Sequence, residues 1–313
     1  MSRRTFNPLF WTLAQIGSRA RSSAPATVED PPLQLPELQA VSLPTRHGDV
    51  RVLVQRPAPS QASAPARTTS STPVAAPAAA PVVVHLHGGG FVNRDPAQDR
   101  HIARHLAAHL GAVVLMPDYD TAPRARYPVA EEEVLDIVRW VTATGPSHGW
   151  DGGRLVLSGV SAGAKLAINA CQQLHAAGET PPLALVLVVP VTDVVRTDRT
   201  SQIRRPAINA RVQRFVAWAY FPDVRRRREA LASPRLDPAL AAAMPPTLVL
   251  TGEHDTLATE GAELVGVLRA GGVTVEHQQY PDADHGFIAD EPVATVRDAL
   301  RTMVSFLRPE LTS

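Results

Sequence analysis

Gly159-Val160-Ser161-Ala162-Gly163 is the stretch of this 313-residue chain that decides its fold. The G-x-S-x-G pattern is typical of a nucleophile elbow, in which a serine lies on a sharp turn between a strand and a helix. The flanking glycines permit such a turn because they carry no side chain that could clash. The pattern also arises by chance in glycine-rich chains, so it needs support from elsewhere in the sequence.

The support comes from a second motif upstream, His87-Gly88-Gly89-Gly90. A glycine loop lets backbone N–H groups come close to a substrate oxygen. Together the two motifs predict acyl transfer with Ser161 as the nucleophile. His87 and Gly90 are expected to order the loop. The predicted oxyanion donors are three backbone N–H groups, those of Gly88, Gly89 and Ala162.

Around these motifs, strand-like and helix-like segments alternate. Short apolar runs predict strands at 50–55, 82–87, 112–117, 155–158, 183–189, 247–251 and 273–280. Helical patterns lie at 97–110, 129–143, 162–177, 258–270 and 292–307. Most of the strand segments are apolar throughout, as in a parallel sheet that is covered on both faces. The order therefore predicts an α/β doubly wound sheet, whose ligands bind at the carboxyl ends of the strands.

The chain divides into four predicted regions. Residues 1–40 are expected to be an N-terminal helical segment that contributes to a cap, and 41–190 to be the first half of the core. The Pro/Ala-rich stretch 57–81 within this half is expected to be a surface loop. Residues 191–238 break the alternation and are expected to form an inserted cap, and 239–313 the second half of the core.

Composition and charge exclude several classes of function. The net charge is +1, so nothing global points to nucleic acid or an anionic membrane as a partner. The longest apolar runs are too short to span a bilayer, so no stable membrane insertion is expected. The single cysteine, Cys171, cannot form an intrachain disulfide, which favours a cytoplasmic location. The N-terminus Ser2-Arg3-Arg4-Thr5-Phe6 leaves open export through a twin-arginine-like signal.

A serine nucleophile needs a histidine base and an acid that orients it. His285 lies in a loop between the last predicted strand and the last helix, where a side chain can reach the elbow. His175, His254 and His277 are less well placed. Asp255 follows the strand at 247–251 and is the predicted acid. Its competitors are other carboxylates nearby, namely Glu253, Glu260, Asp282 and Asp284.

Two further patterns have weaker functional interpretations. His101, His105 and His109 repeat every four residues on one helix, as metal ligands can, but no carboxylate or cysteine completes the set, so no metal is predicted. The predicted cap is rich in arginine, at Arg196, Arg199, Arg204, Arg205, Arg211, Arg214 and 225–228. A solvated face is the favoured interpretation. Binding of an anionic substrate group by one of these arginines is the alternative.

The motifs resemble those of the hormone-sensitive lipase family of α/β-hydrolase esterases over about residues 40–307. The matching segments, in order, are His87-Gly88-Gly89-Gly90-Phe91, Asp118-Tyr119-Asp120-Thr121-Ala122-Pro123 with Tyr127-Pro128, Ser233-Pro234, Pro245-Pro246, 252–257 with Glu260-Gly261, and His285-Gly286-Phe287. The resemblance implies the α/β-hydrolase fold, a mostly parallel central sheet flanked by helices with a helical cap. It implies the triad Ser161, Asp255 and His285, and hydrolysis of short- to medium-chain acyl esters without a cofactor.

The sequence departs from the family pattern at four positions. Val160 stands where an acidic residue or threonine is usual, Ala164 and Lys165 replace a Gly-Asn pair, and Asp120 replaces an arginine. Two alternatives to a simple esterase stay open. The first is a related acyl hydrolase of acetylated, amide or lactone substrates, and the second is a non-catalytic small-molecule receptor. The expected partner is a small-molecule ester, and a homodimer is left open.

Overall fold

The computed structural model describes residues 28–29, 33–58, 79–290 and 292–312. Its centre is one sheet of eight strands in the order β1-β2-β4-β3-β5-β6-β7-β8. The strands are β1 Gln39–Thr45, β2 Gly48–Gln55, β3 Ala80–Leu86, β4 Val113–Pro117, β5 Trp150–Val160, β6 Leu185–Val188, β7 Thr247–Gly252 and β8 Val275–Tyr280. The β1–β2 and β2–β4 pairs are antiparallel, and the pairs from β4 to β8 are parallel.

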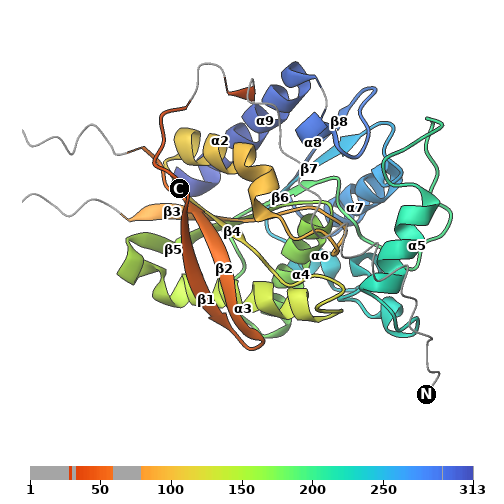
Figure 1. Ribbon diagram of the computed structural model, residues 1–313, viewed down its shortest axis with the longest axis horizontal. Helices are drawn as coiled ribbons and strands as arrows, with labels where there is room; N and C mark the ends of the chain where they lie inside the picture. The colour runs from red at the N-terminus through yellow and green to blue at the C-terminus, as the bar shows by residue number, and fades with distance from the viewer. Residues whose placement is uncertain (1–27, 30–32, 59–78, 291, 313) are drawn as a thin grey trace, which may run out of the picture.

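Helices cover both faces of this sheet (Figure 1). The described helices are α2 Arg100–Leu110, α3 Val129–Thr144, α4 Ala162–Ala176, α5 Ala210–Ala219, α6 Leu240–Ala243, α7 Ala258–Ala270, α8 Phe287–Asp290 and α9 Val293–Thr312. α2 and α9 pack on one face, and α3, α4 and α7 pack on the other. The predicted fold class, a mostly parallel sheet between helices, is confirmed.

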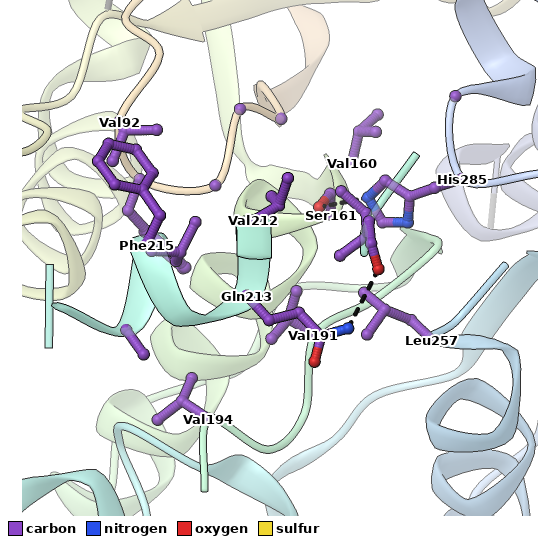
Figure 2. A pocket seen from close by; sticks show the side chains of 18 of the residues that line it. Val92, Val160, Ser161, Val191, Val194, Val212, Gln213, Phe215, Leu257 and His285 are labelled. Carbon is purple, nitrogen blue, oxygen red and sulfur yellow. Dashed lines mark hydrogen bonds between the residues drawn. The ribbon is translucent and has the colours of Figure 1, made fainter. Parts of the chain in front are cut away.

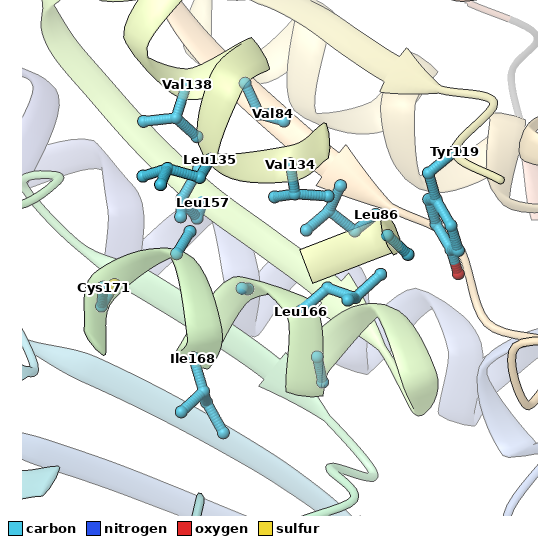
Figure 3. Close-up of a cluster of buried hydrophobic side chains, with 14 of the residues drawn as sticks. Val84, Leu86, Tyr119, Val134, Leu135, Val138, Leu157, Leu166, Ile168 and Cys171 are labelled. Carbon is cyan, nitrogen blue, oxygen red and sulfur yellow. The ribbon is translucent and has the colours of Figure 1, made fainter. Parts of the chain in front are cut away.

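Two hydrophobic cores hold the layers together. On the α3–α4 face, Leu86 and Leu157 of the central strands meet Val134 of α3 and Leu166 of α4 (Figure 3). Cys171 of α4 is buried in this core, and burial raises the pKa of its thiol to about 12. The thiol therefore stays protonated and packs as a small apolar side chain.

The structure differs from the sequence predictions at the N-terminal side. The predicted helical segment 1–40 falls mostly outside the described residues. In its described part, residues 33–38 form no helix and Gln39 begins β1, which the sequence did not predict. The predicted loop 57–81 is described only at its ends, where β3 begins at Ala80. No helix within the described ranges is long and apolar enough to cross a membrane.

A buried carboxylate lies where the loop after β4 meets α3. The Oε2 atom of Glu133 accepts a hydrogen bond from the backbone N–H of Asp120 at 2.8 Å, and the Glu133 side chain is buried. Burial, together with the nearby carboxylate of Asp120, raises the pKa of Glu133 to about 7. Arg94 forms ion pairs with Asp118 and Asp120 of the same loop.

Glu133→Gln should therefore change how stability depends on pH. A carboxyl whose pKa is raised by folding contributes its full stabilisation of the folded state at pH values below its pKa in the unfolded chain. This contribution is lost as the pH rises from there to about 7. The neutral glutamine avoids that loss, so at pH 8 the free energy of unfolding of the variant should exceed that of the parent by up to about 3 kcal/mol. The gain should be much smaller at pH 5.

Urea unfolding at the two pH values measures the effect. Glu276→Gln is the control, because Glu276 is exposed on β8 and its replacement should give the same small change at both pH values. Equal effects of Glu133→Gln at pH 5 and pH 8 would contradict the prediction.

Candidate active site

Ser161 lies on a tight turn between β5 and α4. Its φ of 54° and ψ of −112° place a non-glycine residue in a rarely populated region of backbone conformation. The backbone N–H of Ser161 donates to the carbonyl of Val188 at 2.8 Å, which ties the turn to the end of β6. This geometry lifts the serine side chain out of the sheet edge, as the elbow motif predicts.

The glycines of the motif are required by close packing. A Cβ added to Gly163 would lie 2.0 Å from the carbonyl oxygen of Leu86, and one added to Gly159 would lie 2.4 Å from the backbone of Gly163. The first turn of α4 therefore lies directly against the ends of β3 and β5. Any larger residue at these two positions would push the helix away from the sheet.

Ser161, His285 and Asp255 form one hydrogen-bonded line. The Nε2 atom of His285 is 2.8 Å from the Oγ atom of Ser161, and its Nδ1 atom is 2.8 Å from the Oδ2 atom of Asp255 (Figure 2 shows the first pair). Because a carboxylate only accepts, Nδ1–H donates to Asp255 and Nε2 can accept the serine proton. The other oxygen of Asp255 accepts from the N–H of Leu257 at 2.9 Å. All three side chains are buried.

Two of the competing acids have other partners. Glu260, in the first turn of α7, accepts from the N–H groups of Thr192 and Asp193. Asp284 accepts from the N–H groups of His285 and Ala207, so it links the histidine loop to the segment before α5. This linking role of Asp284 has no signal in the sequence, since its partner Ala207 is 77 residues away.

The glycine loop lies beside the serine, but its N–H groups differ in their surroundings. The Gly88 N–H is 3.4 Å from the Oδ2 atom of Asp99, a buried carboxylate that also lies 3.4 Å from the Nε2 atom of His85. Among the described residues, the N–H groups of Gly89, Gly90 and Ala162 have no hydrogen-bond acceptor. Gly88 thus has a partner within the protein, which was not expected of an oxyanion donor.

His87 is held within the loop. Its Nδ1–H donates to the carbonyl of Gly88 at 2.6 Å, and its ring stacks on Tyr119 with centroids 4.3 Å apart. The hydroxyl of Tyr119 donates to the His87 carbonyl at 2.6 Å. Burial lowers the pKa of His87 below its usual value, so the ring is neutral at pH 7. These contacts fix the path of the loop between β3 and Phe91.

A cavity of about 420 Å³ opens onto Ser161 and His285. Its walls are mostly apolar side chains from the loop after β6, from α5 and from the start of α7. Figure 2 labels Val191, Val194, Val212, Phe215 and Leu257 among them. Val160, the first departure from the family pattern, adds a further apolar side chain beside the serine. Such a lining suits an apolar substrate group.

Two polar side chains of the cavity wall, Arg199 and Gln213, bind each other. The guanidinium of Arg199 donates to Glu260 and Gln213, and the amide of Gln213 donates to the carbonyl of Ile208 at 3.1 Å. Elsewhere in the same region, Arg196 pairs with Glu263 and Arg235 pairs with Asp193. Arg199 is the arginine of the predicted cap that lines the cavity, and its charge is already paired with buried Glu260.

The histidine repeat on α2 does not form a ligand set. His101 donates to the carbonyl of Ile288, while His105 and His109 contact each other with centroids 4.2 Å apart. Burial beside His109 lowers the pKa of His105 to about 4. In the described ranges, the group of three side chains close enough to share a metal ion is Glu253, His254 and Asp282, near the protein surface.

The fold and the Ser161–His285–Asp255 line are those of a serine hydrolase of α/β architecture. A family model described as "alpha/beta hydrolase fold" matches residues 83–289. The chain belongs to this α/β-hydrolase family, in its hormone-sensitive lipase-like group, as the resemblance implied.

Named relatives and solved structures agree with this assignment. "Carboxylesterase NlhH" of Mycobacterium tuberculosis is 30% identical over 213 residues, which cover 66% of this chain and 66% of the relative. "Ethyl acetate hydrolase" of Pseudomonas putida is 29% identical over 245 residues, 70% of this chain and 72% of the relative. A Pyrobaculum calidifontis esterase structure superposes with a TM-score of 0.79 at 25% identity, covering 97% of this chain and 92% of the other.

Gly163→Ala should disrupt the elbow. The added methyl group would overlap the Leu86 carbonyl, so α4 must shift and the free energy of unfolding should fall by about 3 kcal/mol or more. Chemical denaturation measures this change. Gly266→Ala is the matched control, because a Cβ on this exposed glycine of α7 meets open space. It should stabilise the protein by about 0.5–1 kcal/mol. A Gly163→Ala protein as stable as the parent would contradict the packing described above.

Proposed function

We propose that this protein is a serine carboxylesterase that hydrolyses esters of short- to medium-chain acids through an acyl-enzyme. The observation that carries the proposal is the line from Ser161 through His285 to Asp255 at the wall of an apolar cavity. Nε2 of His285 faces the serine hydroxyl at hydrogen-bond distance, as a general base requires. The name of the P. putida relative, ethyl acetate hydrolase, is consistent with a short acyl group.

The first half of the proposed reaction forms the acyl-enzyme. His285 takes the proton of Ser161 as the serine oxygen attacks the ester carbonyl, and the Asp255 carboxylate stabilises the imidazolium. The carbonyl oxygen becomes an oxyanion. We propose that the N–H groups of Gly89, Gly90 and Ala162 bind it, because Gly88 donates to Asp99. The imidazolium then protonates the alcohol oxygen as the carbon–oxygen bond breaks.

The second half releases the acid. Water enters, His285 takes one of its protons, and the hydroxide equivalent attacks the acyl carbon. Collapse of the second oxyanion breaks the bond to Ser161, whose oxygen regains the proton from His285. The chemistry needs no cofactor, because proton transfer and charge stabilisation come from the side chains and backbone named above.

The lining of the cavity favours neutral substrates over anionic ones. Burying a carboxylate without a cationic partner is costly, and Arg199, the arginine lining the cavity, is engaged by Glu260 and Gln213. Between 191 and 238 the chain also supplies Val191, Val194 and α5 to the cavity wall. This placement is what a cap that selects the acyl group requires.

Partners and location are proposed on simpler grounds. The partner is a small-molecule ester. The proposed surfaces for a homodimer are β1 and β8, because the edge strands of a sheet carry unpaired N–H and C=O groups. A cytoplasmic location is proposed because the single cysteine, Cys171, is a buried free thiol, so the fold needs no disulfide. The twin-arginine-like segment lies outside the described residues.

Hydrolysis of p-nitrophenyl esters from acetate to palmitate tests the proposal. The rate constant kcat/KM should peak at short to medium chains, and Ser161→Ala should lower kcat by about 10³-fold or more. Ser147→Ala, which changes an exposed serine, should leave activity unchanged. Mono-p-nitrophenyl succinate should react at least about tenfold more slowly than the butyrate, because its charge must enter an apolar cavity.

Two results would contradict the proposal. Activity that survives in Ser161→Ala would remove the serine from the mechanism. A preference for the succinate over the butyrate would instead point to a cationic subsite among the arginines of residues 191–238.

A further inference from the structure

Lys165 is a fully buried lysine one helical turn after Ser161. Its backbone N–H donates to the Ser161 carbonyl at 3.1 Å, so the two residues share the first turn of α4. A buried ammonium is costly unless charge and hydrogen bonds compensate it, and burial lowers the pKa of Lys165. The resemblance to the family leads one to expect asparagine here, so the charge is a feature of this chain.

Three oxygen atoms from three segments receive the ammonium. Nζ of Lys165 donates to Oε1 of Glu131 at 2.8 Å, to Oδ1 of Asn169 at 2.7 Å and to the carbonyl of Leu231 at 2.9 Å. These acceptors satisfy all three N–H bonds of an ammonium group. The second oxygen of Glu131 accepts from the hydroxyl of Tyr220 at 2.7 Å, so both charges are fully hydrogen-bonded.

Aromatic rings surround the same ammonium. Nζ lies 5.4 Å from the ring centroids of both Phe91 and Phe221, and 5.9 Å from that of Tyr127. These distances are within the range of cation–π attraction. Phe91 also stacks on Tyr220 at 4.7 Å and meets Phe221 edge-on at 5.4 Å. The ammonium therefore attracts a compact group of rings from three parts of the chain.

Phe91 connects this group to the glycine loop. It directly follows Gly90, has a φ of 59°, and is buried. A bulky residue in this left-handed region persists only where its surroundings hold it. The Phe91 carbonyl accepts from the N–H of Ala122 at 2.8 Å, and the side chain lies against the rings beside Lys165. The position of the Gly89 and Gly90 N–H groups thus depends on where Phe91 is held.

We propose that Lys165 is a positioning residue for ester hydrolysis: its ammonium holds Phe91, and through it the Gly89–Gly90 loop, at a fixed place relative to Ser161 on the same helix. The inference rests on the proposed function, because it assigns the held loop to the oxyanion. Lys165 touches no substrate in this role. It acts by keeping the nucleophile and the oxyanion donors, which belong to separate segments, at a fixed position relative to each other.

Lys165→Met tests the inference, since methionine keeps an unbranched apolar chain without the charge. With p-nitrophenyl butyrate, kcat should fall about 10- to 100-fold, while KM changes less than about threefold, because the loop acts on the transition state. Hydrogen exchange of peptides covering 88–94 should become faster than in the parent. Leu174→Ala, which opens a cavity in the same core at the far end of α4, should lower stability without either effect.

A double variant separates positioning from stability. Lys165→Met leaves Glu131 buried without its counter-charge, and adding Glu131→Gln removes that charge. The double variant should regain most of the lost unfolding free energy but keep the low kcat and the fast exchange at 88–94. Recovery of kcat together with stability, or unchanged exchange at 88–94 in Lys165→Met, would overturn the inference. If the parent protein hydrolysed no ester, the proposed function would fail, whereas the exchange result would still test whether Lys165 holds the loop.

Discussion

The close contact between the first turn of α4 and the ends of β3 and β5 is the constraint on which the site depends. Gly163 lies so near the Leu86 carbonyl that no side chain fits between them. Beside this contact the backbone at Ser161 takes its unusual conformation, and the start of α4 lies next to the glycine loop that follows β3. Nucleophile, helix N-terminus and loop are therefore brought together by one packing contact between backbones.

Charged groups hold the remaining segments around this contact. Glu260 joins the loop after β6 to α7 through Thr192, Asp193 and Arg199. Glu131 and Lys165 join α3, α4 and the segment after α5. The arginine-rich stretch is thus partly an internal scaffold, and the cavity that it borders remains apolar. Buried ion pairs are a weak source of stability, but their directional bonds can fix where several loops lie.

The sequence predicted those site residues that a local sequence pattern marks. Ser161 was predicted from its glycine spacing, and Asp255 and His285 from their places after β7 and β8, because loops at one edge of a parallel sheet converge. The structure brings these three side chains within hydrogen-bond distance of one another. β1 was missed because Leu43 is its single fully buried residue, so no apolar run marks it. The pairing of Gly88 with Asp99, and the burial of Lys165 against Glu131, could not be predicted. Both join residues brought together by the fold, and a charged residue in a sequence indicates exposure by default.

A crystal structure of the protein treated with a p-nitrophenyl alkylphosphonate would test the central claim most directly, because the phosphonyl group imitates the charged tetrahedral intermediate. The account predicts phosphorus bonded to Oγ of Ser161, with the phosphonyl oxygen about 2.7–3.1 Å from the N–H groups of Gly89, Gly90 and Ala162 and the alkyl chain in the apolar cavity. Phosphorus on another residue, or a phosphonyl oxygen that none of these N–H groups contacts, would contradict it.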